Sequence, residues 1–295
     1  MIGRFEEEAA VVRRLFTEAA EATSLDDLRW TRLAGGDINQ VFRLEAANGQ
    51  VWLAKIRLDA PKHFFAAEAR GLQELRTARA LRVPEVFAVD AEGILLEWLE
   101  PAAGAEREQG AELGRGLAHL HRMTRDRYGF EENNFIGMLP QNNPWQPSWI
   151  DFYREARLLP QMELAAQKGR FGSNRRRLAD RLLDRLPEWI DEAEVEPSLL
   201  HGDLWGGNWL ATRHGPALID PAVCYGDREM DLAMSRLFGG FPPEFYRAYN
   251  EEFPVRPGHQ DREALYQLYY LLVHLNLFGE SYGPAVDRIL RRYGG

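Results

Sequence analysis

The chain has 295 residues and a formal net charge of −9, with 45% hydrophobic and 27% charged residues. These values are typical of a globular protein with one large or two modest domains, and the acidic balance argues against a nucleic-acid partner, which needs clustered Lys and Arg. No apolar run is long enough to span a membrane, and the single cysteine, Cys224, excludes an internal disulfide framework and fits a reducing cytoplasm, where we expect the protein to act.

The N-terminal part of the chain is predicted to be a helix followed by short strands. Apolar side chains at helical spacing predict a helix over residues 5–22. Strands are predicted over residues 28–33, 41–44 and 51–56. Asn48-Gly49 separates the last two strands and is a strong signal for a hairpin turn.

A glycine turn lies between the first two predicted strands, where backbone N–H groups could cover the phosphates of a nucleotide. It lacks the G-x-G-x-x-G spacing of protein kinases, and a Gly-Gly hairpin is common in any β protein, so the turn alone is weak evidence. The residues of this turn are Gly35, Gly36, Asp37, Ile38 and Asn39.

A lysine and a glutamate follow in the order that a kinase needs. Lys55 stands near the end of the strand over 51–56, and Glu68 lies one turn into a helix predicted over residues 64–81. A kinase binds the α- and β-phosphates of ATP with a lysine on such a strand and holds that lysine with a glutamate on the next helix. Alone, each residue is more often an ordinary surface side chain, but the motif further along the chain favours an ion pair between them.

Two more strands are predicted over residues 86–89 and 93–98. The second ends in L-L-E-W-L-E-P, where a hinge would offer backbone groups to adenine. This inference rests on position and uses little residue-type information. The hinge would consist of Glu97, Trp98 and Leu99.

The pattern becomes helical almost throughout after residue 106, so we place a domain boundary near residues 101–104. This gives an N-terminal ATP-binding lobe of residues 1–102 and a C-terminal catalytic and substrate lobe of residues 103–295. We therefore expect an α+β fold of two lobes, a small one with an antiparallel sheet and a larger, mostly helical one.

The predicted C-terminal helices over 111–123, 150–164 and 175–190 are interrupted by an irregular stretch over 133–149. This stretch is rich in Asn, Pro, Gln and aromatic residues, and a loop of such length is a linker or a functional loop. Amides can hydrogen-bond hydroxyls, and an indole face can pack on a sugar. Asn134 and Trp145 are therefore candidate substrate-binding residues.

The most informative stretch is H-G-D-L-W-G-G-N-W-L-A-T-R-H-G-P-A-L-I-D, in which Asp203, Asn208 and Asp220 stand at the spacing used by kinases of the eukaryotic-like fold. There the first Asp accepts the proton of the attacking hydroxyl, while the Asn and the second Asp hold magnesium on the ATP phosphates. Carboxylate and amide oxygens suit this hard ion. We expect Gly206 and Gly207 to let the backbone turn tightly between base and metal ligand. The competing interpretation is a polar β-turn between two strands.

Only ten residues separate Asp220 from Asp231, which leaves no room for the long phosphorylatable activation segment of a switched protein kinase. Asp231 falls where such folds place a buried aspartate that supports the backbone of the catalytic loop. Simple capping of a helix explains this residue equally well. The strongly apolar helix predicted over 265–278 is expected to be core.

With these motifs in hand, the chain resembles the fructosamine kinase (ketosamine-3-kinase) family, within the aminoglycoside phosphotransferase and choline kinase-like group. H-G-D-x-x-x-x-N followed by I-D, in place of D-F-G, is similar to the wider group. The narrower resemblance rests on Trp205 in H-G-D-L-W-G-G-N and on D-P-A-V-C-Y-G-D-R-E-M-D-L-A-M. The motifs G-G-D-I-N, N-F-I-G, P-Q-N-N-P-W and H-L-N-L-F-G extend it over almost the whole chain.

The resemblance implies ATP-dependent phosphorylation of the sugar 3-hydroxyl of ketosamines, the adducts that sugars leave on amines, as a step of deglycation repair. It implies Asp203 as the base, Asn208 and Asp220 as Mg²⁺ ligands, and Lys55 with Glu68 as the phosphate-binding pair. It also implies that Trp205 shapes the sugar-amine pocket. Many members have a cysteine in the glycine turn where this chain has Asp37, so redox control through that turn is not expected.

Two alternatives stay open. An aminoglycoside or other small-molecule hydroxyl phosphotransferase would use the same catalytic residues, and a pseudokinase scaffold would bind nucleotide without turnover. The substrate would be a small-molecule or protein-bound ketosamine, and the sequence does not identify the sugar or the amine. We expect a monomer.

Overall fold

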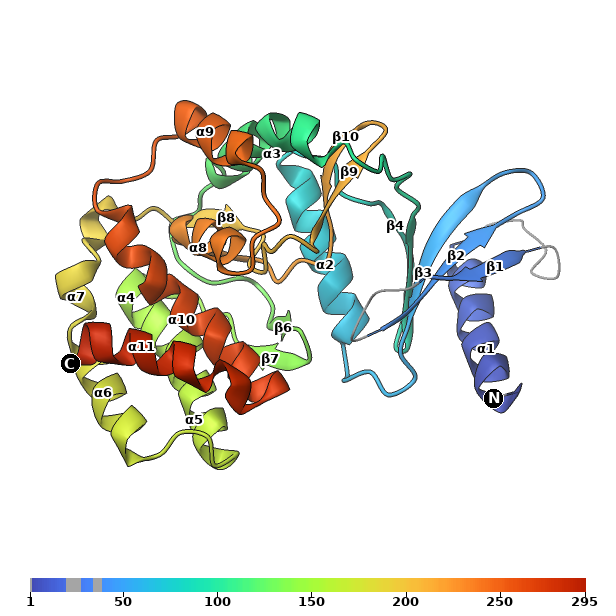
Figure 1. The fold of residues 1–295 in the computed structure, drawn as a ribbon. Helices are drawn as coiled ribbons and strands as arrows, with labels where there is room; N and C mark the ends of the chain where they lie inside the picture. Colours follow the sequence, from blue (N-terminus) through green and yellow to red (C-terminus); the bar gives the residue numbers. More distant parts are fainter. Residues whose placement is uncertain (1, 20–27, 34–38) are drawn as a thin grey trace.

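The structure is a computed structural model, and it describes residues 2–19, 28–33 and 39–295 (Figure 1). Strands dominate the N-terminal part and helices the C-terminal part, which confirms the predicted α+β class. Four residues of the predicted glycine turn, Gly35, Gly36, Asp37 and Ile38, lie outside the described residues.

The N-terminal part is built around a five-stranded antiparallel sheet in the order β1-β2-β3-β5-β4. The hairpin predicted at Asn48-Gly49 joins β2 to β3, and Gly49 has the positive φ of 85° that such a turn requires. The elements are α1 (Ile2–Glu18), β1 (Arg29–Arg32), β2 (Gln40–Glu45), β3 (Val51–Ile56), α2 (Phe64–Thr77), β4 (Val86–Asp90) and β5 (Gly93–Glu97).

Helices α1 and α2 cover opposite faces of this sheet (Figure 1). Along β5, Leu95 packs in the core that contains α1, whereas its neighbours Ile94 and Leu96 pack in the core that contains α2. Successive side chains of a strand point to opposite faces, so this alternation places one helix on each side. Helix α2 is shorter than predicted, because Arg79 has a left-handed φ of 49° just after its end.

The C-terminal part is a helical assembly in which α3 packs on α9, α8 on α10, and α6 on α11. The predicted apolar helix over 265–278 is the buried half of α10. The bounds are α3 (Glu106–His121), α6 (Ser173–Asp184), α8 (Glu229–Leu237), α9 (Pro243–Glu252), α10 (His259–Phe278), η4 (Glu280–Tyr282) and α11 (Gly283–Gly294). No helix of the described ranges is long and apolar enough to cross a membrane.

The helices predicted over 150–164 and 175–190 are each interrupted. The first consists of α4 (Trp149–Phe152), a π-helical segment η2 (Tyr153–Leu158) and α5 (Leu159–Gln167). The second divides into α6 and α7 (Leu186–Trp189), because Pro187 lacks the N–H that a continuing helix needs. A short 3₁₀ turn, η3 (Glu192–Glu194), follows.

The prediction of an irregular stretch over 133–149 is partly wrong. Within it, β6 (Asn134–Ile136) and β7 (Leu139–Gln141) form a hairpin. The amides that suggested a loop satisfy one another: Asn143 N donates to Asn133 Oδ1, and Asn143 Nδ2 donates to Asn134 Oδ1. Side-chain hydrogen bonds therefore order a segment that lacks the usual strand pattern.

Two small sheets hold the predicted catalytic stretch between the two parts of the chain. Strand β8 (Ser198–Leu200) pairs with β11 (Cys224–Gly226), and β9 (Trp209–Thr212) pairs with β10 (Gly215–Leu218). The β9–β10 hairpin also contacts the chain leaving the five-stranded sheet, because Ala102 N donates to Ala211 O at 2.9 Å. The division into lobes at residue 102 stays a prediction.

Candidate active site

The loop between β8 and β9 brings together the three polar residues singled out in the sequence. Asn208 Nδ2 donates to Asp203 O at 2.8 Å, to Asp203 Oδ2 at 3.2 Å and to Asp220 O at 3.3 Å. All three of these hydrogen bonds use the amide nitrogen, which leaves Oδ1 as the atom that can bind a cation. Asp220 has a positive φ of 54°, a conformation that Asp tolerates better than most residues.

Lys55 joins the N-terminal sheet to this group. Its Nζ lies 2.6 Å from Glu68 Oε1, with side chains only 7% and 11% exposed, and it also forms an ion pair with the carboxylate of Asp220. Burial acts to lower the pKa of Lys55, but the two carboxylates outweigh it and raise that pKa. The ammonium group therefore stays charged between two elements that are far apart in the sequence.

The carboxyl group of Asp203 has a strongly shifted pKa. Burial, followed by the nearby charge of Asp220, raises the pKa of Asp203 to about 7, against the hydrogen bond from Asn208, which lowers it. A general base works best with a pKa near the operating pH. A cation between the two carboxylates would lower the pKa of Asp203 again by direct attraction.

Asp231, at the start of α8, supports the backbone of this loop, as one of the two sequence-based interpretations predicted. Its carboxylate accepts from His201 N at 2.7 Å and from Gly202 N at 2.9 Å. Buried His121 lies behind it, with Nε2 3.2 Å from Asp231 Oδ2 and Nδ1 2.8 Å from the Tyr249 hydroxyl. The sequence analysis did not assign His121 this supporting role, because a histidine on an apolar helix face carries no such signal.

The predicted hinge lies at the end of β5. Glu97 N donates to Glu85 O at 2.8 Å, the Glu97 carboxylate is paired with Arg82, and Leu99 is buried. Trp98 Nε1 donates to Glu100 Oε2 at 2.8 Å. Binding of adenine by these residues stays a prediction.

Comparison with known proteins decides the family. The description "fructosamine kinase" belongs to a family model that matches residues 9–293. A probable ketoamine kinase of Enterococcus faecium is 42% identical over 266 residues, which cover 88% of this chain and 94% of that protein. The chain belongs to the fructosamine kinase family. It is thus an ATP-dependent phosphotransferase, as the sequence analysis predicted.

Solved structures agree with this fructosamine kinase assignment. The crystal structure of a candidate fructosamine-3-kinase from Thermobifida fusca is 32% identical, covers 96% of this chain and 98% of its own, and gives a TM-score of 0.87. An ADP-bound aminoglycoside phosphotransferase is 13% identical, and the match covers 94% of this chain and 96% of that protein with a TM-score of 0.60. The second likeness shows a shared kinase-like fold alone.

Trp205, predicted to bind substrate in this member of the fructosamine kinase family, is 42% exposed in the loop between β8 and β9. Its ring packs against the backbone of the next but one residue, since a Cβ atom at Gly207 would lie 2.3 Å from the Trp205 ring. A Cβ at Gly206 would lie 2.9 Å from Gly239 O. Gly206 and Gly207 form the predicted tight turn, which is closed by Asn208 N donating to Trp205 O at 2.9 Å. Neither has a positive φ, so glycine is needed at these positions for close approach.

The other two candidate substrate residues of the kinase lie against the segment that follows Asp220. Asn134 is buried, donates to Val223 O at 2.8 Å and accepts from Gln141 Nε2 at 2.8 Å. Trp145 is 38% exposed and packs on Tyr225, with ring centroids 6.2 Å apart. Their role in binding substrate stays a prediction, and the amide of Asn134 is already engaged at both ends.

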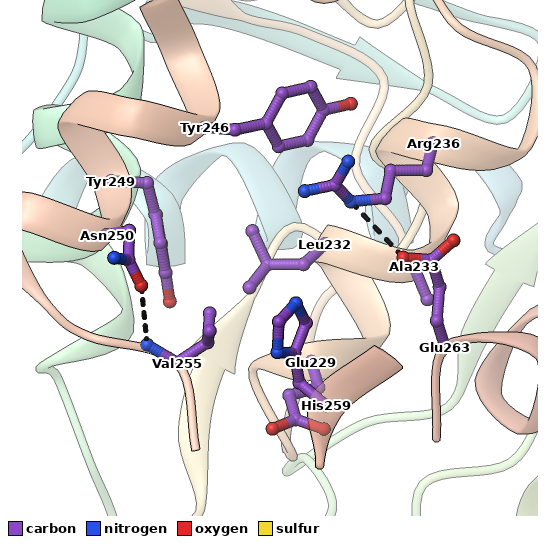
Figure 2. A pocket seen from close by; sticks show the side chains of 10 residues that line it. All are labelled: Glu229, Leu232, Ala233, Arg236, Tyr246, Tyr249, Asn250, Val255, His259 and Glu263. Atoms are coloured by element: carbon purple, nitrogen blue, oxygen red, sulfur yellow. Dashed lines mark hydrogen bonds and ion pairs between the residues drawn. The ribbon is translucent and has the colours of Figure 1, made fainter. Parts of the chain in front are cut away.

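A cavity of about 290 Å³ lies apart from these residues, between α8, α9 and the start of α10 (Figure 2). At its rim the Arg236 guanidinium lies 3.8 Å from the Tyr246 ring centroid and 3.3 Å from Glu263, so its charge is already paired. The lining contains none of the predicted site residues. The residues predicted to act in acid–base chemistry and phosphate binding converge instead on the loop between β8 and β9, which is the candidate active site.

Proposed function

We propose that the protein transfers the γ-phosphoryl group of ATP to the sugar 3-hydroxyl of a ketosamine, as a step of deglycation. The observation that carries this proposal is the Lys55–Asp220 ion pair, which joins the Lys55–Glu68 pair to the Asp203–Asn208–Asp220 group. Kinases use such residues to bind the ATP phosphates, to hold the metal ion and to accept the proton of the acceptor hydroxyl.

Asp203 would accept the proton of the acceptor hydroxyl while the hydroxyl oxygen bonds to the γ-phosphorus. The bond from that phosphorus to the bridging oxygen breaks, and ADP leaves with the electron pair. Lys55, held by Glu68, would bind the α- and β-phosphates throughout. Because the pKa of Asp203 is about 7, the carboxylate form needed to take the proton is accessible at neutral pH.

Mg²⁺ fits the donors that these residues offer. Asn208 Oδ1 and the Asp220 carboxylate are hard oxygen ligands, and Mg²⁺ is usually bound by one or two carboxylates together with substrate phosphates. When bound, the ion would neutralise charge on the β- and γ-oxygens.

Trp205 supports a ketosamine as the acceptor. An exposed indole face next to the predicted base can pack on the apolar face of a sugar or attract an amine cation. An aminoglycoside, which carries several ammonium groups, would call for an acidic pocket. The curated relative carries the words ketoamine kinase in its name, which also favours this acceptor.

The test is a competition among ribulose-lysine, fructose-lysine, kanamycin and choline at equal concentration, with ATP, followed by NMR location of the phosphate. We expect phosphate on the sugar 3-oxygen of a ketosamine. Preferential phosphorylation of kanamycin or choline would contradict the proposal that a ketosamine is the substrate. ATP binding without turnover of any ketosamine would instead favour a pseudokinase.

A further inference from the structure

The segment that follows Asp220 is fixed on both sides by hydrogen bonds. Ala222 N donates to His201 O at 2.9 Å, and Val223 O accepts from Asn134. Tyr225 exchanges two backbone hydrogen bonds with Gly129, at 2.7 and 2.9 Å, within a segment whose β11 strand pairs with β8. Where a protein kinase has its activation segment, this chain has the short strand β11, which pairs with β8 on one side and with Gly129 on the other.

Helix α2, which carries Glu68, docks directly on this segment. At Gly71 a Cβ atom would lie 3.2 Å from Pro221 Cγ and 3.5 Å from Val223 Cγ2, so the helix backbone lies close to this segment and a large side chain at position 71 would have to displace Pro221. At the start of α2, Phe64 packs edge-on against Phe135 of β6, with centroids 5.1 Å apart. Figure 1 shows α2 between the sheet and the β6–β7 hairpin.

A buried carboxylate fixes the second half of the helix. The Tyr225 hydroxyl donates to Glu74 Oε1 at 2.8 Å, and the Glu74 side chain is only 5% exposed. The remaining charged neighbours are more distant: Arg70 Nη2 at 3.3 Å and Arg125 Nη2 at 3.6 Å. The two arginines offset the charge of this buried carboxylate, and the Tyr225 hydroxyl, which links it to the segment after Asp220, is its shortest contact.

These contacts form a continuous series that begins and ends in the segment around Asp220. Asp220 pairs with Lys55, Lys55 with Glu68, α2 links Glu68 to Glu74, and Glu74 returns through Tyr225 to the chain five residues after Asp220. A shift of α2 would break the Lys55–Glu68 pair and the Glu74–Tyr225 contact together.

We propose that Glu74 and Tyr225 are positioning residues that hold α2 in place, so that the Lys55–Glu68 pair stays assembled without any activating event. The inference rests on the proposed function, because it assumes that this ion pair binds ATP phosphates. It adds residues that touch neither nucleotide nor acceptor and act only through the helix.

The first test is Tyr225→Phe, which removes the hydroxyl and keeps the ring. We expect kcat/KM for ATP to fall roughly tenfold, the scale of one lost hydrogen bond to a charged group, with KM for the ketosamine unchanged. Tyr153→Phe is the matched control, because its buried hydroxyl donates to Leu265 O at 2.7 Å, away from α2. It should lower Tm and leave both kinetic constants within about twofold.

A second pair of variants acts on the helix itself. Gly71→Leu should lever α2 from Pro221 and reproduce the ATP-specific loss, whereas Gln73→Leu places the same side chain on the exposed face of α2 and should not. Hydrogen exchange of residues 64–77 should speed up in Tyr225→Phe and Gly71→Leu alone. Unchanged exchange together with unchanged kinetics in both would overturn the proposal.

A double-mutant cycle of Tyr225→Phe with Glu68→Gln decides whether the Glu74–Tyr225 contact acts through the Lys55–Glu68 ion pair. If it does, Tyr225→Phe should add less than about twofold in the Glu68→Gln background. If Glu68→Gln lowers kcat/KM for ATP and Tyr225→Phe lowers it further by its full single-variant factor, the positioning role is overturned. The proposed function then still stands. A Glu68→Gln variant with unchanged kcat/KM for ATP would refute the ion pair's role and the positioning role with it.

Discussion

Asn208 donates through one nitrogen to both the backbone and the carboxylate of Asp203, so the predicted metal ligand also orients the predicted base. The two roles can still be separated by mutation, because only Asp203 would exchange a proton with the acceptor, whereas Asn208 and Asp220 would face the phosphates.

Asp203→Asn should keep ATP binding and lower kcat by roughly 10²–10⁴, the usual contribution of a positioned base. The amide keeps the shape of the side chain but cannot accept the proton. Steady-state kinetics together with calorimetric titration of Mg-ATP checks this. A variant with normal kcat would remove Asp203 from the proposed chemistry.

Asp220→Ala should show a different defect, the loss of metal-dependent nucleotide binding, because Asp220 would hold the ion that neutralises charge on the ATP phosphates. Titration of ATP with and without Mg²⁺ measures it: in the unchanged protein Mg²⁺ should strengthen binding, and in the variant that gain should vanish. If both aspartate variants fold and bind Mg-ATP normally, our assignment of the two roles is wrong.

The proximity of Asp203 and Asn208 could be predicted because it is local in sequence: the two residues are five apart and lie on one loop. The Glu74–Tyr225 contact could not be predicted, since the two residues are 151 apart in the sequence and nothing in either local pattern indicates a partner. Asn134 illustrates the same limit. Its amide donates to Val223 O, 89 residues further along the chain, and no local pattern indicates this contact.

Trp205→Ala should raise KM for the ketosamine and leave KM for ATP unchanged, because its exposed ring lies on the catalytic loop while the predicted phosphate-binding pair lies on β3 and α2. We expect roughly a tenfold effect, the scale of a ring contact with a sugar or amine. Trp145→Ala is the companion variant, since that indole is the other predicted aromatic contact with substrate, is similarly exposed and packs on Tyr225. Equal effects of the two variants would assign substrate binding to both.

Cys224→Ser should keep activity within a few-fold. The thiol is buried on β11, burial raises its pKa, and proton transfer in the proposed mechanism needs no thiolate. Tm should fall modestly, since a buried hydroxyl needs a hydrogen-bond partner. A loss of activity by orders of magnitude, in a variant that still unfolds cooperatively, would mean that this cysteine takes part in the reaction.

Stability should depend on pH through His121. Burial lowers the pKa of His121 in the fold, although Asp231 acts in the opposite direction, so the unfolded chain binds a proton more readily than the folded one. The stabilisation is therefore fully present above the unfolded pKa of about 6.5 and is lost as pH falls below it, by at most about 1.4 kcal/mol per pH unit.

His121→Gln should flatten the slope of unfolding free energy against pH between about 6.5 and 5, because it removes that proton uptake. Urea unfolding at several pH values gives the slope, and His119→Gln, on the exposed side of the same helix, controls for the change of residue type. His121→Gln should also lower stability at pH 8, since the group behind Asp231 is lost. An unaltered slope with reduced stability would show that His121 supports Asp231 without contributing to acid sensitivity.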